Sequence, residues 1–85
     1  MILYDFWAPW CGPCLMMNPV VEQLEKEKPE LTVMKVNIDD DTLQISAHFN
    51  VRSIPTLLMT DESGQEVARV VGATSLAEIK KQLKL

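Results

Sequence analysis

The apolar and β-prone residues of this chain fall into four short runs that are typical of strands. They cover residues 2–7, 31–38, 56–60 and 66–71, and turn or charged residues bound them, as expected for strands in a small domain. The last two runs are separated by the segment DESGQ, a turn signal in which Gly64 is free to adopt a positive φ. These two runs are therefore predicted to form a hairpin.

Between the first two runs, the apolar positions change to a helical spacing. They fall at i, i+3, i+4 and i+7 and form one stripe, made of Met17, Val20, Val21 and Leu24. This spacing predicts an amphipathic helix that starts near the cysteines. Pro19 lies inside the helix and is expected to kink it.

Two later segments carry the start signal of a helix. Asp41 and Gln44 have the spacing of a capping box, and Ser75 and Glu78 repeat it, which predicts a short second helix and a C-terminal third one. The apolar positions that follow are Leu43, Ala47 and Phe49 in the second helix and Leu76, Ile79 and Leu83 in the third. The element order becomes β-α-β-α-β-β-α, which predicts an α/β fold with one sheet and helices packed on it.

Composition and charge narrow the picture to one small domain. The chain has 85 residues, 47% of them hydrophobic, and no linker divides it, so residues 1–85 are expected to form a single domain. The 8 basic residues are scattered and the net charge is −4, which argues against a nucleic-acid partner. The longest uncharged stretch, residues 6–21, is broken by prolines and a glycine and is no membrane span. Without a signal-peptide pattern, we expect a soluble, cytoplasmic protein.

The candidate chemistry lies in Cys11 and Cys14, the only two cysteines. At a helical i, i+3 spacing their Cβ atoms are about 5–6 Å apart, so the thiols can join or part with little backbone movement. A helix N-terminus stabilises a thiolate through its dipole and its unpaired N–H groups. Because Pro13 has no N–H, the Cys14 N–H is the expected donor to the Cys11 sulfur. Cys11, ahead of the helix, is the predicted accessible nucleophile, and Cys14 is the resolving thiol.

Two other uses of this cysteine pair are weaker. A structural disulfide that closes so short a loop would stabilise the fold by only about 2 kcal/mol. A zinc site normally has four ligands, but the sequence has no second CxxC, and its only histidine, His48, lies far away in a predicted helix. The pattern therefore favours redox chemistry and predicts no metal.

One acid, Asp5, interrupts the first apolar run six residues before the first cysteine. Its neighbours are Tyr4, Phe6 and Trp7, so burial should favour its neutral form. A carboxyl with a raised pKa could exchange protons with Cys14, which has to lose its proton to break a mixed disulfide. The alternative is an acid at the edge of the strand that faces water, and the apolar run around Asp5 disfavours it.

Five segments of the chain together resemble the thioredoxin family: DFWAPWCGPC, followed in order by VNID, IPT, SGQEV and VVGA. A lone CxxC would be weak support, but WCGPC with a distant Ile-Pro-Thr is specific, and the resemblance runs from about Leu3 to the C-terminus. It implies a thioredoxin-like α/β fold with a four-stranded mixed sheet and helices on both faces. The family usually begins with a further strand and helix, so the fold is expected to be shortened at its N-terminal end.

The resemblance also implies roles for individual residues. Cys11 and Cys14 match the redox-active dithiol of the family. Asp5 matches its buried acid, and Lys35 matches the lysine near that acid. Trp10 matches the tryptophan before the nucleophile, on the expected substrate surface.

Further matches extend this substrate surface. Pro55 matches a cis-proline beside the disulfide that leaves the backbone of Ile54 free to pair with a substrate segment. Gly72 matches a glycine that lets the substrate backbone approach. Gly12 and Pro13, between the two cysteines, complete the expected substrate-binding set.

Two departures from the family pattern carry expectations of their own. Leu15 stands where the family often has a basic residue, which removes a positive charge near the thiolate and enlarges the apolar rim. Without the usual first strand, the run 31–38 should be an edge strand, guarded by Lys35 and by the acidic residues 39–41. We expect a monomer of modest stability, with apolar surface left open near residues 43–49.

The expected function is a thiol–disulfide oxidoreductase that reduces disulfides of protein substrates. The resemblance implies no bound cofactor and a separate electron donor of the thioredoxin reductase type. A disulfide oxidase or isomerase would use the same couple, and only the reduction potential separates these functions. A further alternative is a binding module, in which the surface around Trp10, Leu15, Ile54 and Gly72 docks a partner and the cysteines are incidental.

Overall fold

The chain folds into the predicted alternation of strands and helices, in a computed structural model that describes all 85 residues. The strands are β1 (Ile2–Trp7), β2 (Thr32–Asn37), β3 (Thr56–Thr60) and β4 (Glu66–Val71). The helices are α1 (Gly12–Glu27), α2 (Ile45–His48) and α3 (Leu76–Leu83), and a short 3₁₀ helix, η1 (Ile38–Asp40), follows β2. The order β-α-β-α-β-β-α is confirmed, and η1 is the one element that the sequence did not predict.

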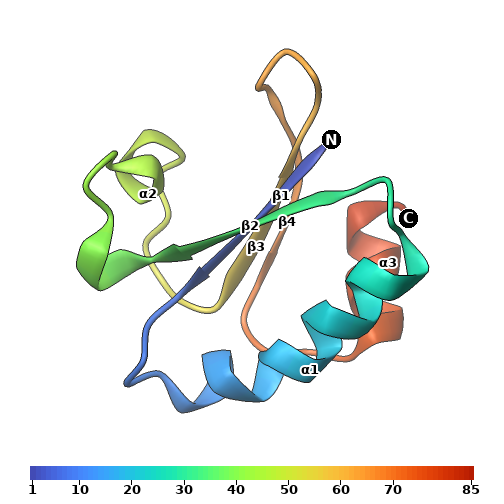
Figure 1. Cartoon of the computed structure of the whole chain (residues 1–85), viewed down its shortest axis with the longest axis horizontal. Helices are drawn as coiled ribbons and strands as arrows, with labels where there is room; N and C mark the ends of the chain where they lie inside the picture. The colour runs from blue at the N-terminus through green and yellow to red at the C-terminus, as the bar shows by residue number, and fades with distance from the viewer.

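The four strands form one mixed sheet in the order β2-β1-β3-β4. β1 runs parallel to β2 and antiparallel to β3, and β3 and β4 form the predicted antiparallel hairpin. The hairpin turn projects beyond one end of the sheet (Figure 1), and Gly64 within it has a φ of 86°, a backbone conformation that glycine adopts at little cost. β2 lies at the edge of the sheet, as the sequence predicted.

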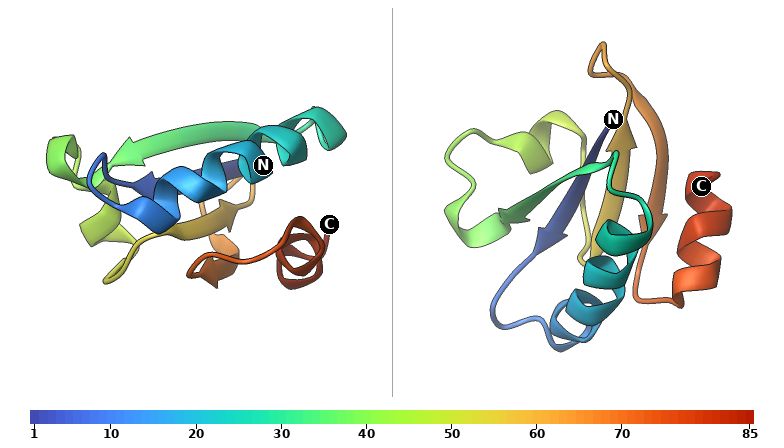
Figure 2. Two further views of the ribbon diagram at one scale, coloured as in Figure 1. Left: turned by 90° about the horizontal axis from the view of Figure 1, so that it is seen from below. Right: turned by 45° about the vertical axis from the view of Figure 1, so that its right-hand side comes forward.

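Helices cover both faces of this sheet, because successive side chains of a strand point to opposite sides. Figures 1 and 2 show α1 and α3 on one side and α2 on the other. On β1, Leu3 packs with α1 and α3, whereas Phe6 packs on the α2 side. Asp5 shares the face of Leu3 and therefore points towards α1.

The main core lies between the sheet and the helices α1 and α3. Its buried residues are Leu3, Met17, Val21, Leu24, Leu31, Leu57, Met59, Val70, Ile79 and Leu83. They include three residues of the predicted α1 stripe, and the fourth, Val20, packs against them. On the α2 side, the buried apolar cluster is smaller and consists of Phe6, Val36 and Leu58. The two faces of the sheet are therefore covered to very different extents.

α1 and α3 begin where the sequence predicted. Cys11 is the N-cap residue of α1, Pro13 lies in its first turn, and the helix continues past Pro19. Ser75 caps α3, because its side-chain oxygen accepts a hydrogen bond from the Glu78 N–H at 3.2 Å. Both starts use a side chain at the N-cap position to satisfy a free N–H group of the first turn.

The capping box predicted for α2 is wrong. Gln44 has a left-handed backbone (φ 54°) and makes no side-chain cap, and Leu43 is 81% exposed instead of packing inward. Asp41 still holds the start of α2, because its carboxylate accepts hydrogen bonds from the N–H groups of Ile45 and Ser46 at 3.0 and 2.8 Å. The helix therefore begins later than a capping box starting at Asp41 requires.

Candidate active site

The two cysteines lie where β1 leads into α1 and are joined as a disulfide. Their Cα atoms are 5.3 Å apart, within the range that a disulfide bridges without backbone movement. Cys11 is 6% exposed and Cys14 is 1% exposed, so Cys11 is the more exposed of the two, as predicted. It is nevertheless less accessible in the disulfide state than the sequence suggested, because Trp7, Ile38 and Ile54 pack around the cysteine pair.

The first turn of α1 places a hydrogen-bond donor against the Cys11 sulfur. The Cys14 N–H donates to Cys11 Sγ at 3.2 Å, as predicted, and Pro13 between them has no N–H that could compete. A charged sulfur accepts a stronger hydrogen bond than a neutral one, and the positive end of the helix dipole lies at the same point. The arrangement therefore favours an ionised Cys11 once the disulfide has been opened.

Asp5 is enclosed on the α1 side of the sheet, with 2% of its surface exposed. The alternative of an acid that faces water is therefore wrong. Burial raises the pKa of Asp5 above its ordinary value of 3.8, the attraction of Lys35 opposes that shift, and the repulsion of Glu25 adds to it. Neither ion pair of the chain includes Asp5. Its carboxyl consequently stays protonated to a higher pH than that of a surface aspartate.

Lys35 lies next to Asp5 in the sheet but is not bonded to it. The two residues are partners in the parallel register of β1 and β2. The Lys35 Nζ instead donates to the Asn18 Oδ1 of α1 at 3.3 Å. Asn18, which sequence reasoning missed, therefore fixes where the ammonium group stands relative to the buried acid.

The residues predicted to bind substrate meet beside the disulfide. The Ile54–Pro55 peptide bond is cis, as the resemblance implied, and Ile54 packs against the cysteine pair. Gly72 has a φ of 91°, and its N–H donates to the Pro55 carbonyl oxygen at 2.8 Å. Gly12 and Pro13 are exposed at the start of α1. Three separate segments thus converge on one edge of the disulfide.

Trp10 stands on the same surface and is 67% exposed. Its Nε1–H donates to the Asp39 Oδ2 at 2.8 Å, so η1 holds the indole from a point 29 residues along the chain. Sequence reasoning missed this contact, because the acidic run that contains Asp39 was interpreted only as a guard of the β2 edge. The hydrogen bond restricts the orientation of a large exposed side chain next to the disulfide.

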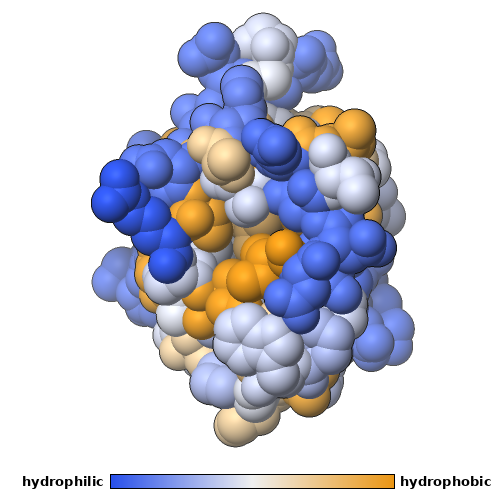
Figure 3. Space-filling view, turned by 90° about the vertical axis from the view of Figure 1, so that its left-hand side faces the viewer, coloured by the Kyte–Doolittle hydropathy of each residue, from blue (hydrophilic) through white to orange (hydrophobic).

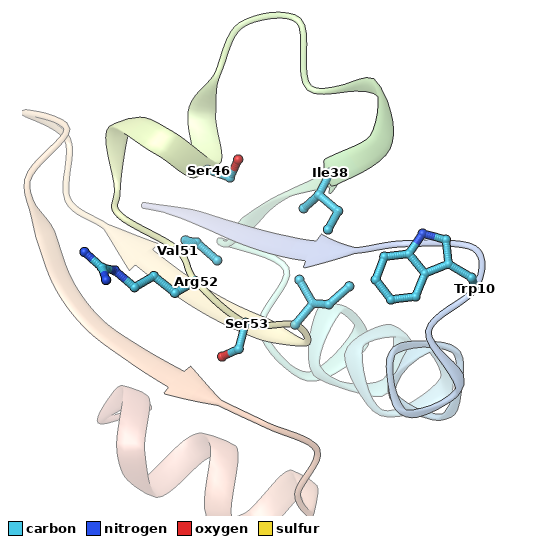
Figure 4. A pocket seen from close by; sticks show the side chains of 7 residues that line it. Trp10, Ile38, Ser46, Val51, Arg52 and Ser53 are labelled. Atoms are coloured by element: carbon cyan, nitrogen blue, oxygen red, sulfur yellow. The ribbon is translucent and has the colours of Figure 1, made fainter.

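A pocket of about 300 Å³ opens on the α2 side, next to Trp10. Its walls are Trp10, Ile38, Ser46, Val51, Arg52, Ser53 and Ile54. Figure 3 shows apolar side chains gathered in a hollow at the centre of this face, with polar side chains around it. In Figure 4, Trp10 and Arg52 lie at opposite ends, with Ile38 and Val51 between them. The sequence predicted open apolar surface near residues 43–49, but of these residues only Ser46 lines the pocket, and residues 51–54 supply most of its wall.

Arg69 of β4 ties the α2 side of the pocket to the sheet. Its Nη2 donates to the Phe49 carbonyl oxygen at 2.7 Å, and its Nε pairs with the Glu66 carboxylate at 2.6 Å. That hydrogen bond to Glu66 raises the pKa of Arg69. The Phe49 ring also packs against Tyr4, with centroids 5.3 Å apart. The short helix is thus held by side chains from both β1 and β4.

The structure offers no cluster of the side chains that usually bind metals. No group of three or more His, Cys, Asp or Glu residues comes together. His48 is exposed, and its ring packs edge-on against Phe49, with centroids 4.7 Å apart. None of the helices has both the length and the apolar character needed to cross a bilayer.

Known proteins resemble this chain in sequence and in structure. A family model described as Thioredoxin matches residues 1–85. The chain is 43% identical over 83 residues to a thioredoxin of Porphyra purpurea, a match covering 96% of this chain and 76% of that protein. It is 52% identical over 73 residues to a thioredoxin of Haemophilus influenzae, a match covering 85% of this chain and 66% of that protein.

Solved structures show the same likeness. The oxidized form of mitochondrial thioredoxin 3 from Saccharomyces cerevisiae superposes with a TM-score of 0.84 at 31% identity, covering 99% of this chain and 77% of that one. A second structure, on the thiol resolving mechanism in yeast mitochondrial 1-Cys peroxiredoxin via glutathione/thioredoxin systems, contains a similar chain. That chain superposes with a TM-score of 0.84 at 30% identity, and the match covers 99% of this chain and 77% of that one. The thioredoxin-like α/β fold predicted from the sequence is confirmed.

Proposed function

As a member of the thioredoxin family, the chain is a thiol–disulfide oxidoreductase, and we propose that it acts as a reductase of disulfides in protein substrates. The observation that carries this proposal is the Cys11–Cys14 disulfide at the N-terminus of α1, with the Cys14 N–H directed at the Cys11 sulfur. Such a pair supplies a stabilised thiolate together with a second thiol that can displace the product.

In the proposed reaction, the Cys11 thiolate of the reduced chain attacks one sulfur of a substrate disulfide. The substrate S–S bond breaks, a mixed disulfide with Cys11 forms, and the other substrate sulfur leaves as a thiolate. Cys14 then loses its proton, and its thiolate attacks the Cys11 sulfur. The bound substrate sulfur leaves and the Cys11–Cys14 disulfide closes, so two electrons have passed from the chain to the substrate.

We assign to Asp5 the transfer of protons to and from Cys14. A general acid–base group works best when its pKa lies near the working pH, and burial moves the pKa of Asp5 upward, in that direction. Lys35 supports this role, because it is the strand partner of Asp5 and its attraction limits the shift. The pair would keep Asp5 able both to accept and to return a proton.

We place the substrate across the surface beside the disulfide. An extended segment lying along Ile54 would have its cysteine close to Cys11, and the open space over Gly72 would admit its backbone. Trp10, together with Gly12 and Pro13, borders the same surface. Leu15, which is half-exposed in the first turns of α1, extends the apolar rim.

The cycle ends with a disulfide that has to be reduced again. We therefore infer a separate electron donor of the thioredoxin reductase type. The sulfur atoms carry the electrons, so the cycle requires no bound cofactor. Regeneration of the dithiol needs a reducing compartment, and on this ground we infer a cytoplasmic location.

Reduction of insulin disulfides in the presence of dithiothreitol tests the proposal. The wild-type chain should accelerate the reduction, and Cys11→Ser should abolish the acceleration. Cys14→Ser should accumulate a mixed disulfide with the substrate, because the resolving thiol is absent, whereas Cys11→Ser should accumulate none. Acceleration that survives in Cys11→Ser would contradict the assigned nucleophile.

The direction of electron flow is tested by titrating the Cys11–Cys14 pair against glutathione. A reductase should have a potential near the value of about −270 mV typical of thioredoxins. A value near about −180 to −120 mV, the range of isomerases and oxidases, would show instead that the pair donates its disulfide to substrates.

A further inference from the structure

Arg52 is a cation without an acidic partner, at the end of the pocket opposite Trp10 (Figure 4). Its Nε donates to the Asn50 Oδ1 at 3.2 Å, and neither of its two terminal nitrogens donates to an acceptor of the chain. The two ion pairs of the chain use Arg69 and Lys80 instead. The guanidinium is therefore anchored through one nitrogen, and its outer edge is free to bind a ligand.

Arg52 is the only charged residue among the seven that line the pocket. Ile38, Val51 and Ile54 are apolar, and the remaining residues besides Trp10 are two serines. Asp39, which holds the Trp10 indole, belongs to the opposite end. On a chain of net charge −4, Arg52 thus creates a local site that favours a negative group beside an apolar cavity. Arginine binds a carboxylate through two parallel N–H groups, which gives direction as well as charge attraction.

We propose that Arg52 is a specificity-determining residue, which selects substrate segments that carry an acidic side chain two positions away from an apolar one. The inference rests on the proposed function, because the segment is the one whose cysteine reacts with Cys11. In an extended segment, side chains two residues apart point to the same side and are about 6.5 Å apart. One such side chain would enter the pocket over Val51, and the other would meet Arg52.

Matched peptide disulfides test this selection. Each substrate is a disulfide-linked homodimer of a short peptide with one cysteine, one Leu, and either Glu, Gln or Lys two positions from the Leu, placed in turn on each side of the cysteine. The wild-type chain should reduce the best Glu peptide with a kcat/KM about 2- to 5-fold above that of its Gln counterpart, the range expected for an exposed charge pair. The preference should shrink at about 1 M salt, where the Debye length falls to about 3 Å.

The charge reversal Arg52→Glu should invert the order, so that the Lys peptide becomes the better substrate. Lys84→Glu is the matched control, because it makes the same change in net charge at the exposed C-terminal end of α3, on the other side of the sheet. This control should retain the wild-type preference. Equal rates for the Glu and Gln peptides at every position, or a preference that survives Arg52→Glu, would overturn the proposal.

A binding measurement separates this proposal from the reductase function. The oxidised chain is titrated with the same peptides carrying serine in place of cysteine, and tryptophan fluorescence reports binding, since Trp10 stands at the pocket. Tighter binding of the Glu peptide without any reduction of the disulfide substrates would refute the reductase function and support the role of Arg52. Reduction of all peptides without a difference in either binding or rate would refute the role of Arg52 alone.

Discussion

The side of the sheet that carries α1 and α3 buries ten apolar residues in one cluster, whereas the side that carries α2 buries three. Full burial of an aliphatic or aromatic side chain stabilises a fold by about 1.5–3 kcal/mol, so most of the hydrophobic stabilisation comes from the α1–α3 side. The α2 side keeps its apolar residues half-buried around a pocket. Stability thus comes largely from one face of the sheet, and the pocket that we propose for substrate recognition lies on the other.

The largest predicted contrast is between one core substitution on each face. Leu83→Ala on the α1–α3 side should lower the free energy of unfolding by about 2–5 kcal/mol, because it leaves a cavity, with kcat/KM per folded molecule unchanged. Val51→Ala in the pocket wall should lower it by less than about 1 kcal/mol and raise KM. Urea denaturation and insulin reduction measure both effects.

Ile79→Val provides a milder core variant if Leu83→Ala does not fold. It should cost about 0.5–1.5 kcal/mol and leave KM unchanged. A pocket variant that destabilises the chain more than a core variant does would contradict the division of roles between the two faces.

Asp5→Asn tests the buried acid on the α1–α3 side of the sheet. Because burial raises the folded-state pKa of Asp5, the carboxyl is neutral in both states below about pH 3.8, and stability is lost as the pH rises through the raised pKa. Asn does not ionise, so the variant should be more stable than wild type near pH 7 and equally stable near pH 3.

The same variant should turn over more slowly, because it has no proton to exchange with Cys14. Thermal melts across this pH range and insulin reduction provide the two readouts. A lower melting temperature at pH 7 with unchanged turnover would show that attraction to Lys35 outweighs the cost of burial.

Asp39→Ala tests whether the hydrogen bond between Asp39 and Trp10 positions the indole for substrate. Loss of the hydrogen bond to the Trp10 indole should free the ring and raise KM for insulin by about 2- to 5-fold, the size of an exposed charged interaction, with kcat nearly unchanged. Asp39→Asn keeps an oxygen acceptor and should stay close to wild type. Equal KM values for the Ala variant and wild type would show that the hydrogen bond does not position Trp10 for substrate.

The smallest effect is expected from the β2 edge. We predict that the reduced chain is a monomer at micromolar concentration, because Lys35 in the strand, the acidic residues 39–41 and a net charge of −4 oppose pairing between edges. Sedimentation velocity should show one species. A dominant dimer that disappears in Val33→Pro would show that the edge is used for assembly.

The strands and the long helices could be predicted because their signals are local. β1, β3 and β4 match the predicted runs, since apolar residues in short runs between turn signals leave few other structures. Enclosure of Asp5 also followed from its neighbours in sequence. The start of α2 could not be predicted, because Gln44 adopts a left-handed backbone conformation. Glutamine has no preference for this conformation, so the sequence gives no sign of it.

The parts of the site that depend on distant contacts were missed. Nothing in the sequence around Trp10 indicates that Asp39 accepts its N–H, and nothing around Lys35 indicates Asn18 as its acceptor. Such contacts depend on the exact position of each helix over the sheet. Hydrophobic spacing indicates which face of a helix is buried, but not which polar side chains it brings together. The cis bond before Pro55 came only from the family resemblance, because about 5–6% of X–Pro bonds in folded proteins are cis.

The way the α2 region is fastened also bears on how this protein can evolve. Asp41 holds the start of α2, and Arg69 holds its end by binding the backbone oxygen of Phe49. Neither set of hydrogen bonds involves the side chain of Val51 or Arg52. Arg52 is exposed, and Val51 is only partly buried, where it packs against the small apolar cluster on this side of the sheet. Under the proposed function, mutations at Arg52 should therefore change substrate choice with little effect on folding, whereas those at Val51 are limited by its packing. Duplicated copies of such a gene can diverge in their substrates and keep the same redox couple.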